Sequence, residues 1–308
     1  MSLDGFSSAW YDLTFRYKYS VAEGDEFQSL FGGVMERAHP GDFTKVQPWG
    51  NVGDRKCDGY LASERMVFGC YAPKEFSPLP RAVEKVRGDH AGALLHWKPY
   101  MDAWTFVHND HHGLPPDLLQ TLEDLKGVDI SVSVAHWGLP ELEIKVRALS
   151  VSDLVALFGA APTGRDVMAV RQEDLRHVLP ALAGALAMAP VPLDLRPVPP
   201  QKLEFNQLSD QGRLFLTLGM QVSDRVRQFF DRWEPGVGDR ITAGFNTRYQ
   251  ELRADGTRSP DDILWSLYEF AGRDALTSTR EHSAVVALLA FLFEACEIFE
   301  RPGQMASS

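Results

Sequence analysis

A proline-rich segment at residues 189–200 (APVPLDLRPVPP) is the feature that most constrains how this chain can fold. Proline fixes φ and lacks a backbone N–H group, so such a run favours an extended, semi-rigid connector over a helix or a central strand. Before the segment, strand-like runs alternate with helical patterns, whereas the patterns after it are helical. The sequence therefore predicts an α/β domain at 1–188, a proline-rich linker at 189–200 and an all-α domain at 201–308.

The prediction for residues 1–188 depends on helix-like and strand-like patterns that take turns along the chain. Residues 21–42 begin with apolar side chains at helical spacing and end in a His-Pro-Gly stop signal. Strand-like runs follow at 42–49, 57–63 and 65–72, and later within 93–110 and 128–138. A second amphipathic helix is expected at 115–127. This alternation is typical of helices packed on a sheet.

Four helical patterns support the all-α prediction, at 211–233, 238–255, 259–273 and 280–301. The third opens with SPDD, which places Ser at the N-cap, Pro at the first helical position and acids in the first turn. The last is apolar on all sides from 284 to 293, so we expect it at the buried centre of the domain.

Composition narrows the classes of function. The chain carries a net charge of −11, which repels polyanions, but residues 37–87 hold nine basic and six acidic residues. The apolar run at 284–293 is too short to span a bilayer, so we expect no membrane partner. Three cysteines without metal-ligand spacing indicate reduced thiols and favour a cytoplasmic location.

Three short motifs fall on the first predicted helix and on two strands that follow it: GDEFQ at 24–28, GDRKCDGYL at 53–61 and VFGCYAP at 67–73. They resemble the Mrr-like branch of restriction endonucleases, in which the pattern runs G-x-x-F-E, G-x-D and Q-x-K. The resemblance implies a restriction-endonuclease-like mixed sheet flanked by helices. It also assigns the catalytic positions to Gln28, Asp58, Gly69 and Tyr71, of which only Asp58 keeps the family residue.

The replaced residues decide whether such a core is active. In the family the aspartate binds Mg²⁺, and the lysine positions or polarises the attacking water. Gly69 has no side chain, and the phenol of Tyr71 is neutral at pH 7 and cannot supply a lysine's positive charge. We therefore expect a pseudo-nuclease that needs no cofactor. Mg²⁺ is expected only if the core is active, with Asp58 as its candidate ligand.

Basic residues beside the motifs are the candidate DNA contacts: Arg55, Lys56 and Lys74. The same region also offers a way to restore catalysis. A shifted Lys56 or Lys74, acting with Glu23 or Glu26, would give a Mg²⁺-dependent endonuclease in place of an inactive scaffold.

The segment HNDHHG at 108–113 contains three histidines, which are common transition-metal ligands. Neighbouring residues on a turn point in different directions, and no distant Cys or His pair accompanies them. We interpret the segment as a solvated loop after a strand.

A longer set of motifs is spread over most of the chain: FQSLF at 27–31, GDFTKVQPWGNVGDRKCDGY at 41–60, WTFVHND at 104–110, LSVSDLVALFGAAP at 149–162 and FLFEACEIFERP at 291–302. It is similar to proteins of bacterial ABC-three-component, Lamassu-like, anti-phage systems. The resemblance implies an SMC-like or ABC-type ATPase and further defence-complex subunits as partners. The sequence has no G-x-x-x-x-G-K-[ST] phosphate loop, so we do not expect this chain to be the ATPase itself.

The predicted function is a non-catalytic component of a defence complex, in which a degenerate nuclease-like scaffold assembles with the ATPase and DNA is a further candidate ligand. Two alternatives stay open. One is an active Mg²⁺-dependent DNA endonuclease effector. The other is a purely structural protein-interaction scaffold without nucleic-acid contact.

Overall fold

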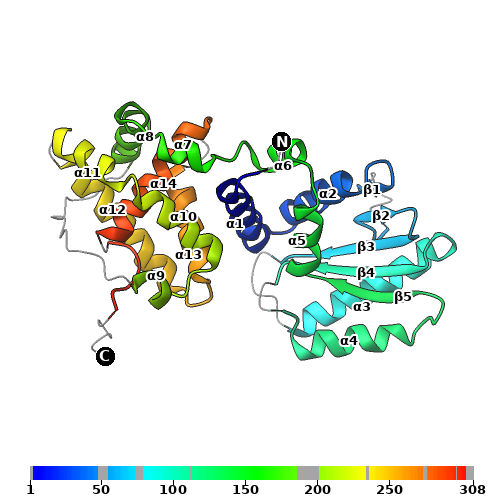
Figure 1. The fold of residues 1–308 in the computed structure, drawn as a ribbon. Helices are drawn as coiled ribbons and strands as arrows, with labels where there is room; N and C mark the ends of the chain where they lie inside the picture. The colour runs from blue at the N-terminus through cyan, green and yellow to red at the C-terminus, as the bar shows by residue number, and fades with distance from the viewer. Residues whose placement is uncertain are drawn as a thin grey trace. The chain divides into compact units, whose positions relative to one another are not determined.

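The computed structural model describes residues 3–47, 55–73, 79–110, 113–185, 201–233, 236–272, 276–295 and 297–302. The protein is mixed α/β, with a five-stranded sheet and many helices (Figure 1). The chain divides into two compact units. Lys18–Leu157 form the sheet unit, and Met1–Tyr17 together with Phe158–Ser308 form the terminal unit.

The five strands lie in the sheet in chain order: β1 (Phe43–Lys45), β2 (Gly59–Leu61), β3 (Met66–Tyr71), β4 (Ala103–His108) and β5 (Ser133–Trp137). β1, β2 and β3 pair antiparallel, and Gly59 lies between Lys45 on one side and Phe68 on the other. β3, β4 and β5 run parallel. Parallel neighbours need a crossover connection, and a helix supplies it between each pair.

Helices cover both faces of this sheet. The helices along this part of the chain are α2 (Asp25–Ala38), α3 (Leu79–Trp97), α4 (Pro116–Lys126), α5 (Leu139–Arg147) and α6 (Val151–Phe158), with a short 3-10 helix, η2, at Lys98–Tyr100. In Figure 1, α3 and α4 lie along one face and α2 along the other.

Strand side chains alternate between the two faces, so each face buries an apolar layer. Val86 of α3 and Leu122 of α4 belong to the layer that also contains Trp104 of β4. On the other face, the rings of Phe31, Phe43 and Phe68 pack together beneath α2.

Helix α3 is where the predicted and observed elements of the sheet unit differ most. The sequence predicts a strand within 93–110, but residues 93–97 complete α3, and β4 begins at Ala103. Gly88 and Gly92 lower the helix propensity of this stretch and hide the helix from a local pattern.

The described part of the terminal unit contains a further set of helices: α7 (Gly164–Met168), α8 (Gln172–Ala185), α9 (Lys202–Phe205), α10 (Asp210–Met220), α11 (Ser223–Arg232), α12 (Val237–Ala254), α13 (Pro260–Gly272) and α14 (Thr279–Glu294). α14 is the central one, because residues 283–293 are all buried and α7, α8, α10, α11 and α13 pack around it. This confirms the buried position predicted from the apolar run, although the helix ends at Glu294 and not at 301.

Helix α1 (Gly5–Val21) contributes to both units. Its first turns pack in the terminal unit, where the ring of Phe6 stacks on Phe215 at 5.7 Å and Trp10 Nε1 donates to Tyr268 Oη at 3.0 Å. The described residues 3–17 and 158–185, which lie within the predicted α/β domain, group with the C-terminal helices. The predicted linker at 189–200 lies outside the described residues.

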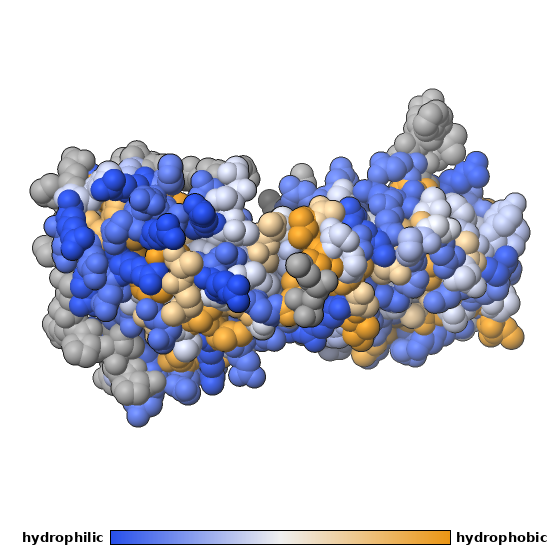
Figure 2. All heavy atoms as spheres, turned by 45° about the horizontal axis from the view of Figure 1, so that its top comes forward, coloured by the Kyte–Doolittle hydropathy of each residue, from blue (hydrophilic) through white to orange (hydrophobic). Residues whose placement is uncertain are grey.

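The surface is mixed in character. Hydrophilic residues cover most of the face drawn in Figure 2, with apolar side chains in scattered patches. Single exposed apolar residues include Ile130 and Leu95, which are 95% and 77% accessible. Among the described helices, none combines the length and the apolar character needed to cross a membrane.

Candidate functional site

Asp58 lies where the antiparallel strands of the sheet unit begin to pair. Its backbone N–H donates to the carbonyl of Phe68 at 2.8 Å, and its own carbonyl accepts from the N–H of Val46 at 3.2 Å. Its carboxylate Oδ2 accepts a hydrogen bond from the backbone N–H of Cys70 at 2.6 Å. The Asp58 side chain thus adds a hydrogen bond to β3 directly before β2 begins, which is a structural role for the carboxylate.

Aromatic side chains of β4 pack against the two motif positions on β3, Gly69 and Tyr71. A Cβ atom at Gly69 would lie 3.4 Å from Cζ2 of the Trp104 indole. The ring of Tyr71 packs against Phe106, with centroids 6.0 Å apart. Residues two apart on a strand share a face. The positions that would hold the family's Gln and Lys therefore belong to an aromatic layer beneath α3 and α4.

Gln28 comes from α2, whose start is joined to the end of β3. The N–H of Gly24 donates to the carbonyl of Ala72 at 2.7 Å, and the N–H of Gln28 donates to the carbonyl of Gly24 at 3.1 Å. The structure therefore places the first turn of α2 next to the strand that carries Gly69 and Tyr71.

The predicted DNA contacts have different environments. Lys56 has a φ of 64° and packs across α3, because a Cβ atom at Gly92 would lie 2.6 Å from its Cγ. Its Nζ pairs with Asp89 Oδ1 at 3.0 Å, and Asp89 also binds Lys85. Arg55 is exposed at the surface, and Lys74 lies outside the described residues. Much of the charge of Lys56 is therefore balanced by a buried carboxylate.

Lys45 and Lys85 are two basic residues that the motif analysis missed. The stem of Lys45 lies over α2, where a Cβ atom at Gly32 would be 2.8 Å from Cδ, and its Nζ donates to Ser29 Oγ at 3.3 Å. Lys45 pairs with Gly59 across the sheet, next to Asp58. The sequence places Lys45 only within the predicted strand at 42–49, and the strand register is needed to show that it lies opposite Gly59, next to Asp58.

The buried thiol of Cys70 lies among these charges. Burial raises its pKa well above the ordinary value, and the negative charge of Asp58 raises it further, followed by Cys57. Lys45 and Lys85 act in the opposite direction but do not reverse the shift. Cys70 is therefore held as a neutral thiol and is not a nucleophile.

These residues do not fit a magnesium site of the family type. Mg²⁺ is usually bound through one or two carboxylates with several waters. Asp58 already accepts a backbone N–H, and neither Gly69 nor Tyr71 adds a carboxylate. Within the described ranges, no group of three or more His, Cys, Asp and Glu side chains is placed to hold a metal ion.

His108 corrects the loop prediction for HNDHHG. It is the last residue of β4 and is buried, while His111 and His112 lie outside the described residues. Burial and, after it, the nearby His136 lower the pKa of its imidazole from 6.5 to about 4, against the opposing effects of Asp110 and Glu141. His108 is therefore neutral at physiological pH.

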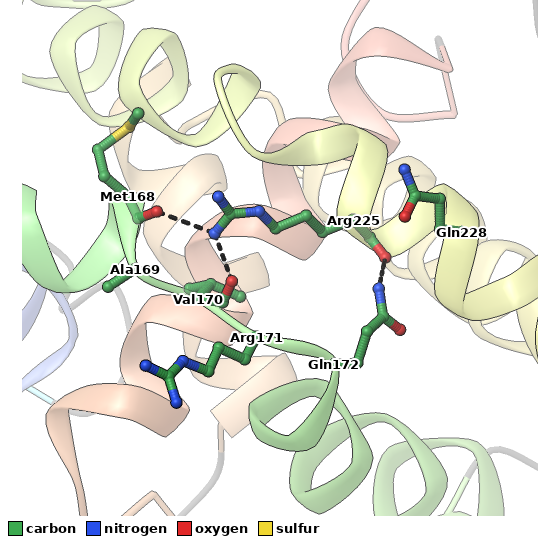
Figure 3. Close-up of a pocket in the computed structure, with 7 residues that line it drawn as sticks. All are labelled: Met168, Ala169, Val170, Arg171, Gln172, Arg225 and Gln228. Atoms are coloured by element: carbon green, nitrogen blue, oxygen red, sulfur yellow. Dashed lines mark hydrogen bonds between the residues drawn. The ribbon is translucent and has the colours of Figure 1, made fainter.

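The terminal unit contains a shallow groove of about 490 Å³ (Figure 3). Residues 168–172, which join α7 to α8, form one wall, and Arg225 and Gln228 of α11 form the other. Figure 3 shows Arg225 reaching across the groove, where its Nη1 donates to the carbonyl of Met168 at 2.8 Å and to that of Val170. Gln172 Nε2 donates back to the carbonyl of Arg225 at 2.8 Å.

The geometry defines a protein with a sheet unit whose described residues form no complete metal site and a helix-rich unit with a polar groove. Residues 173–300 match the family model described as C-terminal domain 10 of the ABC-three component (ABC-3C) systems. Comparison with curated proteins and with solved structures finds no match. The family match supports the predicted similarity to ABC-three-component proteins and a role in a multi-component defence system. It covers less than half of the chain and does not include the sheet unit.

Proposed function

We propose that this chain is a non-catalytic component of a bacterial anti-phage complex of the Lamassu-like, ABC-three-component type. The observation that carries the proposal is the match of residues 173–300 to a C-terminal domain of ABC-3C systems. In this proposal the chain assembles with an SMC-like or ABC-type ATPase and further subunits. The sheet unit serves as a degenerate nuclease-like scaffold.

The topology of the sheet unit supports a restriction-endonuclease-like origin. Helix α2 precedes three antiparallel strands, and α3 then leads to β4, which is parallel to β3. The resemblance requires a helix, an aspartate strand and a third strand in this order. Asp58 stands directly before β2, and Gly69 and Tyr71 stand on β3.

The contacts of these residues support the absence of catalysis. The Asp58 carboxylate binds the Cys70 N–H, and aromatic rings pack at positions 69 and 71. A nuclease that retained this centre would need an acid and an ammonium group from other elements.

Asp58→Asn tests the non-catalytic role in cells that carry the whole defence system. Asparagine keeps a side-chain oxygen for the Cys70 N–H but loses the charge that a metal ion needs. We expect phage plating to be unchanged, with normal protein levels on an immunoblot. A loss of protection of about a hundredfold or more at normal protein level would contradict the proposal, because losing an essential catalytic group has effects of at least this size.

Assembly is tested by purifying the tagged chain from the same cells. We expect the ABC-type ATPase of the system to co-purify in a fixed ratio through size-exclusion chromatography. A chain that elutes alone, while the ATPase is present in the lysate, would contradict the proposed partnership.

The second candidate is a Mg²⁺-dependent endonuclease, and one observation favours it. Lys45 and Lys85 oppose the rise in the pKa of the Cys70 thiol, and the Cys70 N–H binds the Asp58 carboxylate, so two ammonium groups act electrostatically on this region although position 71 is tyrosine. Plasmid nicking by the purified chain with Mg²⁺ or Mn²⁺, abolished by Asp58→Asn and by Lys45→Met, would establish this candidate in place of the first. We expect no nicking.

A further inference from the structure

The groove between residues 168–172 and α11 has a fixed shape. Arg225 donates to two main-chain carbonyls of the opposite wall, and Gln172 returns a hydrogen bond to the Arg225 carbonyl. These contacts hold the two walls together without any ligand. A site that is already ordered loses less conformational entropy when it binds.

The groove is electropositive in its lining. Its described lining contains two arginines and two glutamines and no carboxylate. Only Nη1 of the Arg225 guanidinium is hydrogen-bonded within the described parts of the chain, which leaves its other N–H groups as donors. The nearby Asp174 is engaged by the N–H of Arg171, and Asp224 by Arg227 at 3.9 Å.

Guanidinium groups suit planar anions, because their N–H donors match the two oxygens of a carboxylate. The groove also has an apolar edge, since the Met168 side chain is 42% exposed at its rim. Methionine and arginine are enriched at protein interfaces, whereas lysine and acidic residues are depleted there. Methionine also adapts its shape to different partners.

We propose that this groove docks an acidic peptide segment of another subunit, with carboxylates on Arg171 and Arg225 and an apolar side chain on Met168. The inference rests on the proposed assembly, for which it supplies an interaction surface. The groove is open and shallow, as suits a strand of peptide, and its walls are the α7–α8 connection on one side and α11 on the other.

The test measures peptide binding by the purified full-length chain. The probe is a fluorescein-labelled twelve-residue peptide of Glu, Asp and Leu, followed by fluorescence anisotropy, and the control peptide replaces the acids with Gln and Asn. We expect saturable binding of the acidic peptide and binding of the neutral one weaker by about tenfold or more.

Two charge changes examine the two walls. Arg171→Glu and Gln228→Glu should each weaken binding by about fivefold or more, since each places a like charge beside the peptide. Arg280→Glu is the matched control, because it makes the same charge change as Arg171→Glu on an exposed arginine of α14 that does not line the groove. It should change the affinity by less than about twofold.

Three results would overturn the inference. They are no saturable binding of the acidic peptide, equal weakening by Arg280→Glu and Arg171→Glu, and binding of single-stranded DNA to the same residues with higher affinity than the peptide. Failure of the ATPase to co-purify, with peptide binding intact, would instead contradict the proposed function and leave the groove assignment standing.

Discussion

At His108, burial and the nearby His136 lower the pKa of the imidazole from 6.5 to about 4. The unfolded chain therefore binds this proton more readily than the folded chain does, so stability is fully present above about pH 6.5 and is lost as the pH falls towards 4. We predict that this group alone lowers the free energy of unfolding by about 2 kcal/mol between pH 7.5 and pH 5.

His108→Gln, compared with the parent chain by urea denaturation from pH 7.5 to pH 5, isolates this effect. Burial also lowers the pKa values of His90 and His282, so the difference between the two chains is the informative quantity. The variant should lose less stability on acidification. His96→Gln, which changes an exposed histidine, should keep the parent's pH dependence. Equal slopes for the parent chain and His108→Gln would refute the assignment.

Gly59, next to Asp58, lies where α2 meets the sheet. A Cβ atom there would be 2.4 Å from Cζ of Phe43 and 2.7 Å from Cε2, and the Phe43 ring is itself packed against Phe31 and Phe68. We predict that Gly59→Ala lowers the free energy of unfolding by about 1–3 kcal/mol, as overpacking of a core does. Gly88 of α3 has nothing within 4 Å of such an atom, and Gly88→Ala should raise stability by about 0.5–1 kcal/mol. Urea midpoints that shift in the same direction for both variants would show that the contact with Phe43 does not decide the outcome.

Among the elements, α1 joins residues from the start of the chain to the helices of the terminal unit. The Trp10 indole is buried, donates to Tyr268 and packs edge-on to Trp265 at 5.8 Å. We predict that Trp10→Ala destabilises the chain by about 3–5 kcal/mol, because it removes a large buried ring and one partner of the buried Tyr268 hydroxyl.

Ser8→Ala is the control for this change, since Ser8 lies on the exposed side of the same turn and should shift stability by less than about 0.5 kcal/mol. Both variants are compared by thermal unfolding of the full chain. A Trp10→Ala protein that melts with the parent would show that α1 is not an integral part of the terminal unit.

The sequence predicts α2 and α14 because their apolar periodicity is strong, and it places Asp58 at the start of a strand. It misses α3, whose glycines weaken the helical pattern. It also cannot pair Trp10 with Tyr268, which lie 258 positions apart. Tertiary contacts of this kind decide where the units divide.

The sequence likewise identifies only some of the residues of the candidate site. The motif identifies Asp58, Gly69 and Tyr71, but the charges around them come from elsewhere. Lys45 comes from the neighbouring strand and Lys85 from α3. The sequence also cannot show that Lys56 is paired with Asp89, because that contact joins a turn to a helix.

For the whole molecule, charge decides how strongly the isolated chain can bind nucleic acid. The net charge is −11, and Lys56 and Lys85 share the buried Asp89, so these two cations are less available to phosphates near the nuclease-like motifs. We predict no saturable binding of a 20-base-pair duplex below about 100 µM at 150 mM salt, at the weak end of non-specific DNA binding. At low salt, any binding that develops should be reduced by Arg55→Ala and unaffected by Arg147→Ala on α5. Fluorescence anisotropy across a salt series measures both effects. Micromolar binding at 150 mM salt, with a steep salt dependence, would require a basic surface that these charges do not supply. Such a result would favour a function of this chain in direct DNA binding over a function based on protein partners.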